Sequence, residues 1–92
     1  MIVRIAEDGQ YQFPDDQSEQ LNDLDNQLVA AVDAGDENQF ADLWGQMVEL
    51  VRSSGALVPE DELVGSDVIL PPEDITFAEA AREFTGEGLI PD

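Results

Sequence analysis

Two stretches of the chain, residues 16–34 and 37–54, carry apolar side chains at the spacing of one helix face. Apolar residues that recur every three or four positions indicate an amphipathic α-helix. The stripes are Leu21, Leu24, Leu28, Ala31 and Val32, then Phe40, Leu43, Trp44, Met47, Leu50 and Val51. Gly35 predicts the end of the first helix, and Asp36 predicts the N-cap of the second. The short break between them predicts an antiparallel helical hairpin.

The outer ends of this helical hairpin are also predicted by residue type. Asp16, with Glu19 three residues later, has the spacing of a capping box and predicts the start of the first helix. Gly55 predicts the end of the second helix, and Arg52 complements the dipole in its last turn. The stripes are compatible with binding a partner coiled coil, but such stripes more often pack within the protein. We therefore expect them, and Trp44 with them, in the core.

The first 13 residues, MIVRIAEDGQYQF, predict a β-hairpin. We expect a three-residue loop at residues 7–9, because a two-residue loop would mix polar and apolar side chains on both faces. Gly9 would take the left-handed conformation that ends such a loop. Arg4 would then face Gln12 on the outer side of the hairpin. The expected apolar pairs on the inner side are Val3 with Phe13 and Ile5 with Tyr11.

The sequence after Gly55 consists of short apolar pieces separated by acids and prolines. Residues 68–70 (VIL) predict a third short strand, which a two-stranded hairpin needs for stability. Thr76 with Glu79 predicts a capped third helix. Its expected inward residues are Phe77, Ala80, Ala81 and Phe84; Gly86 is its expected C-cap, and Leu89 and Ile90 are expected to contact the core. The prediction is an α+β fold in one domain of residues 1–92, with the hairpin packed on three helices.

The charge restricts the partners of this chain. It carries 22 acidic residues, three arginines and no lysine, with a formal net charge of −19. Such a charge repels phosphate backbones and anionic lipid surfaces, which argues against direct contact with nucleic acid or membrane. No apolar run approaches the length that spans a bilayer. The cytoplasm is the expected compartment.

Catalytic side chains are scarce. The chain has no histidine and no cysteine, so a neutral-pH general base of the usual kind and a thiol nucleophile are excluded, and the lack of lysine excludes a Schiff base. The run DLDNQ at residues 23–27 resembles the start of a calcium loop but lacks its glycine, and its leucines place it inside a helix. We expect neither an enzyme nor a bound cofactor or metal ion.

Surface residues remain as candidates for binding a macromolecule. Arg4 on the outer hairpin face is either an ordinary solvated or ion-paired arginine, or a contact to an acidic group of a partner. Gln12 shares that face. Exposed acids of the helical hairpin, Asp23, Asp42 and Glu49, are the other candidates for a protein interface.

Three segments carry a resemblance to a known family: MIVRIAEDGQYQF, the helix break AGDEN, and PEDELVGSDVILPPEDITFAEAAREFTGEGLIPD. Over its whole length the chain is similar to PspAA, the PspA-associated domain of the phage-shock system. The resemblance implies a non-enzymatic accessory protein that binds or modulates PspA, a coiled-coil protein of the envelope-stress response. It implies recruitment to the inner face of the membrane through that partner, and it transfers no binding residues. A second hypothesis is an acidic mimic of nucleic acid that occupies a basic protein, because carboxylate arrays imitate phosphates.

Overall fold

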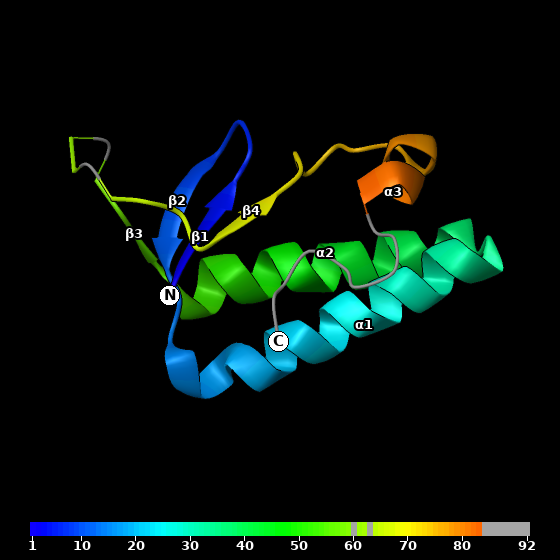
Figure 1. The fold of residues 1–92 in the computed structure, drawn as a ribbon, viewed down its shortest axis with the longest axis horizontal. Helices are drawn as coiled ribbons and strands as arrows, with labels where there is room; N and C mark the ends of the chain where they lie inside the picture. The colour runs from blue at the N-terminus through cyan, green and yellow to red at the C-terminus, as the bar shows by residue number, and fades with distance from the viewer. Residues whose placement is uncertain (60, 63, 84–92) are drawn as a thin grey trace.

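The computed structural model describes residues 1–59, 61–62 and 64–83 and has an α+β fold, as predicted. The described elements are β1 (Ile2–Ile5), β2 (Gly9–Gln12), a 3-10 turn (Asp15–Gln17), α1 (Ser18–Ala34), α2 (Glu37–Ser54), β3 (Ala56–Leu57), β4 (Val68–Leu70) and α3 (Phe77–Glu83). Figure 1 shows the sheet over one end of the α1–α2 pair and α3 over the other end. Among the described residues, no helix or strand covers the far side of the helix pair (Figure 1).

The sheet has the order β3-β2-β1-β4 among the described residues. The predicted strand at 68–70 is confirmed as β4, which pairs in parallel with β1. The sequence did not predict β3, a two-residue strand that pairs with the outer edge of β2. It follows α2 directly, because Gly55 turns the chain out of the helix and along β2. A side chain at Gly55 would lie 2.5 Å from the Val51 carbonyl oxygen and 3.1 Å from Cβ of Tyr11, so this close approach requires glycine.

The predicted register of the hairpin is wrong by two residues, although the faces are right. Val3 lies opposite Tyr11, and Arg4 lies opposite Gln10 instead of Gln12. The three-residue loop is therefore at residues 6–8. Its left-handed residue is Glu7, with φ of 67°, and Gly9 is an ordinary strand residue.

Hydrogen bonds at both ends of the hairpin explain this register. The loop closes through a bond from the Asp8 amide to the Ile5 carbonyl, 3.0 Å. At the open end, the Phe13 amide donates to the Met1 carbonyl at 2.8 Å, and the Met1 ammonium donates to the Phe13 carbonyl at 2.9 Å. The predicted register would lose this terminal pair.

The inner face of the sheet and one side of the helices form the core. Val3, Ile5, Phe13 and Leu70 are fully buried there. The helix stripes supply the other half: Leu21, Leu28, Ala31, Phe40, Leu43, Trp44, Met47 and Val51 are buried, while Leu24, Val32 and Leu50 pack partly buried at the edge. This confirms that the stripes are used inside the protein, Trp44 included.

The helix ends agree with prediction in the middle of the chain and differ at its start. Gly35 ends α1 in the left-handed conformation, and the Asp36 carboxylate accepts a bond from the Gln39 amide at 3.1 Å, which caps α2. Asp16 is not the cap of α1. It lies in the 3-10 turn that precedes the helix, so α1 begins at Ser18, one residue later than predicted, after Gln17, which makes no side-chain cap bond.

The capping box of α3 is confirmed. The Glu79 amide donates to the Thr76 hydroxyl at 3.2 Å, and the Glu79 carboxylate accepts from that hydroxyl at 2.9 Å and from the Thr76 amide at 3.4 Å. Ala80 is buried, and Phe77 packs edge-on against Phe40 with ring centroids 5.7 Å apart. Ala81 is exposed, which corrects the predicted inward face. The expected roles of Phe84, Gly86, Leu89 and Ile90 lie outside the described residues.

Candidate functional site

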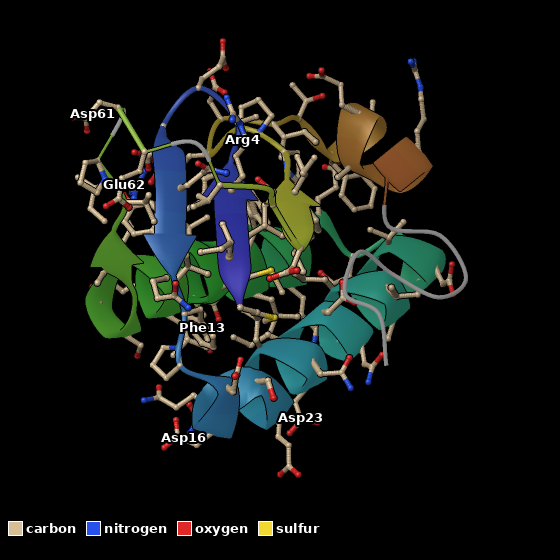
Figure 2. The ribbon with its side chains drawn as sticks, turned by 60° about the vertical axis from the view of Figure 1, so that its left-hand side comes forward. Arg4, Phe13, Asp16, Asp23, Asp61 and Glu62 are labelled. Atoms are coloured by element: carbon tan, nitrogen blue, oxygen red, sulfur yellow. The ribbon has the colours of Figure 1, made fainter. Side chains whose placement is uncertain are left out.

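The two sets of predicted interface residues lie on different surfaces. Arg4 and Gln12 are exposed on the outer face of the sheet, because their neighbours in the strands point into the core. Asp23 is exposed on α1. Figure 2 shows Arg4 and Asp23 at opposite ends of the molecule. The fold therefore offers two separate surfaces instead of one combined site.

The helix pair carries an acidic surface. Asp42 and Glu49 are exposed on α2, as predicted, and Asp42 accepts a bond from Gln46 at 3.3 Å. The other exposed acids of the two helices are Glu19, Asp23, Asp33 and Glu37. Arg52 is the one basic residue of α1 and α2, and its charge is already matched by carboxylates of other segments. Apart from the paired Arg52, all exposed charged side chains of these helices are therefore negative.

Arg52 forms an ion-pair cluster with two distant segments. Its Nε and Nη2 donate to one Asp8 carboxylate oxygen at 2.9 and 2.6 Å, and its Nη1 and Nη2 donate to the two Glu73 oxygens at 3.1 Å each. The Tyr11 hydroxyl donates to Asp8 at 3.2 Å. The hydrogen bonds that Arg52 donates to Glu73 and then to Asp8 raise its pKa above the ordinary value. The guanidinium therefore stays charged at every working pH.

Sequence reasoning missed this cluster. It assigned Arg52 to the dipole of its helix, but the partners lie 44 and 21 residues away along the chain. No local pattern signals them, because the fold alone brings the hairpin loop and the segment after β4 to the end of α2. The same segment is fixed again by Trp44, whose indole N–H donates to the Glu73 carbonyl at 3.0 Å. The cluster is a structural tie between three segments.

Residues 64–66, which lie between β3 and β4 along the chain, lie against the outer sheet face. β3 and β4 lie at opposite edges of the sheet, and Gln10, on the outer face, donates to the Val64 carbonyl at 3.0 Å and to the Ser66 hydroxyl at 2.8 Å. Asp67 then accepts a bond from the Ile2 amide at 2.7 Å. Arg4 and Ile69 stay exposed beside this segment.

The acid-rich run 23–27 does not form a calcium loop. It lies within α1, with Asp23 exposed and Asp25 fully buried on another side of the helix. Among the described residues, no three acidic side chains are grouped closely enough to hold a metal ion. In the same part of the chain, no helix is both long and apolar enough to cross a membrane.

Comparison with known proteins identifies the family. The model of PspAA, described as PspA-Associated protein, matches residues 1–92, the whole chain. The chain belongs to the PspAA family. Curated proteins and solved structures give no significant match. PspAA is a PspA-associated accessory family and is not a known enzyme family.

Proposed function

We propose that this PspAA chain is a non-enzymatic accessory protein of the phage-shock response that binds and modulates a PspA-like coiled-coil protein. The family match over residues 1–92 supports association with PspA. The protein would act in the cytoplasm and reach the inner face of the membrane only through that partner. A surface this acidic would be repelled by anionic lipids.

One observation supports this function beyond the family name: the exposed side of α1 and α2 is an acidic surface, on which every charged side chain apart from the paired Arg52 is a carboxylate. Asp23 on α1 and Asp42 and Glu49 on α2 belong to it. Carboxylates fixed on rigid helices attract a partner that carries basic segments and accelerate its association. We therefore assign the acids of the helix pair to electrostatic attraction of PspA.

Calorimetric titration of the purified chain with PspA, repeated over a range of salt concentrations, tests this function. We expect binding that weakens as salt rises, because salt screens charge attraction. The variant Asp23→Lys/Asp42→Lys/Glu49→Lys should bind about a hundredfold more weakly at low salt, since like charges then face each other across the interface.

A matched control separates the effect of the helix-surface charges on binding from the effect of the net charge. The variant Asp61→Lys/Glu62→Lys/Asp74→Lys changes the net charge by the same amount at three exposed acids outside α1 and α2. We expect it to lose much less affinity than the helix variant. Equal losses would contradict the assignment to the helix surface, and absence of binding by the unaltered chain at every salt concentration would contradict the function itself.

The mimicry of nucleic acid is a second candidate because the same helix carboxylates are exposed in rows along α1 and α2. It would require that the chain displace a DNA or RNA duplex from a basic protein. Competition of the chain with duplex DNA for such a protein, measured by fluorescence anisotropy, tests it. Binding to PspA that added DNA does not affect would favour the accessory role.

A further inference from the structure

The four strands contain no carboxylate, in contrast to the rest of the chain. Their sequences are IVRI, GQYQ, AL and VIL, while the whole chain has 22 acidic residues. On the outer face, Arg4 lies between Gln10 of β2 and Ile69 of β4 in one row across the sheet. Ile69 is 62% exposed. A cation and a large apolar side chain thus lie side by side on an otherwise acidic protein.

Arg4 has no carboxylate partner among the described residues. Two nearby acids are already engaged: Asp67 accepts from the Ile2 amide at 2.7 Å, and Asp8 is bound by Arg52. Glu7 lines the same hollow as Arg4 but forms no ion pair with it. Gln10 is engaged with residues 64–66. The guanidinium therefore has its fork of donors free for an external acceptor.

The edges of the sheet are poor sites for adding a strand. β3 has two residues, and β4 has three and is followed directly by Pro71 and Pro72. Short edges that end in proline do not serve as templates for another chain. A partner on this side of the molecule has to lie on the face of the sheet instead.

We propose that the Arg4–Ile69 surface docks an amphipathic helix of the partner that presents a carboxylate between apolar side chains. The carboxylate binds the Arg4 guanidinium through two hydrogen bonds, and the flanking apolar side chains cover Ile69. This deepens the proposed function and rests on it: the helix belongs to the PspA-like protein, whose basic segments contact α1 and α2.

The charges of the described residues favour this occupant over the others. A basic helix would be repelled by Arg4. A second copy stacked on this face through a two-fold axis would bring another chain of net charge −19 against the first. A phosphate chain carries a negative charge at every nucleotide, whereas the proposed helix brings one carboxylate to Arg4, so the surrounding acids repel the phosphate chain more strongly.

Titration of PspA with Arg4→Glu and Arg82→Glu tests the docking surface. Both variants change the net charge by the same amount, and both arginines are exposed, but Arg82 lies on α3. We expect Arg4→Glu to weaken binding at least about thirtyfold, because two carboxylates then face each other. Arg82→Glu should bind as the unaltered chain does or slightly more tightly. Ile69→Ser should bind PspA about tenfold more weakly, because less apolar surface is buried in the complex.

The outcomes separate this proposal from the function on which it rests. If the unaltered chain binds PspA and Arg4→Glu behaves like Arg82→Glu, the docking surface is wrong and the function stands. If the unaltered chain does not bind PspA at all, the function fails. Thermal unfolding of each variant verifies the fold, and Arg4→Lys, which keeps the charge but not the fork of donors, should restore part of the affinity lost in Arg4→Glu.

Discussion

At the scale of single residues, the hairpin loop contains a strained residue that the sequence pattern does not predict. Glu7 has φ of 67°, a region that costs a residue with Cβ about 1 kcal/mol, whereas Gly9, two residues later, has ordinary strand geometry. We expect Glu7→Gly to raise the free energy of unfolding by about 0.5–1 kcal/mol. Gly9→Ala should be tolerated, because the added Cβ lies at an ordinary 3.5 Å from Leu57. Urea unfolding followed by Trp44 fluorescence measures the free energy of unfolding of both variants. Destabilisation by Glu7→Gly together with strong destabilisation by Gly9→Ala would instead favour the register predicted from sequence.

At the scale of elements, the Arg52 cluster connects α2 to the hairpin loop and to the segment after β4. The Arg52 side chain is 34% exposed, so solvent weakens its ion pairs. Two carboxylates bind the same guanidinium, however, so the loss of Arg52 removes both pairs at once. We expect Arg52→Ala to lower the free energy of unfolding by about 1–2 kcal/mol, and Arg52→Lys by less, because lysine keeps the charge without the fork of donors. Arg82→Ala is the control and should change it by no more than about 0.5 kcal/mol. Equal effects at both positions in urea unfolding would refute a stabilising role for the cluster.

The elements also show what a sequence can predict in physical terms. The helix pair, its Gly35–Asp36 break and the capping box of α3 follow from local patterns, because spacing and cap chemistry act within a few residues. β4 was predictable from its apolar run and the prolines after it. The register of the hairpin, β3 and the partners of Arg52 were not, since each depends on contacts between segments far apart in the chain. Contacts between distant segments also determine how the candidate interface residues are arranged. Arg4 and the helix acids were predicted from the sequence, but only the fold shows that they lie on separate surfaces.

At the scale of the whole molecule, self-repulsion opposes the folded state. The net charge is −19, and of the chain's basic side chains Arg52 alone forms ion pairs among the described residues. Raising the salt from about 0.01 M to about 1 M shortens the screening length from about 30 Å to about 3 Å, so most of this repulsion disappears. We expect the melting temperature to rise by about 5 °C or more.

A variant with three neutralised acids shows whether salt raises the melting temperature by screening charge or by another effect. The variant Asp23→Asn/Asp42→Asn/Glu49→Gln removes part of the repulsion without adding positive charge, so it should melt higher than the unaltered chain at low salt and gain less from added salt. Circular dichroism during heating measures both responses. A melting temperature that falls with salt would mean that attractive pairs outweigh repulsion, and the acidic helix surface would then be held in place by cations of the chain instead of being free to attract a basic partner.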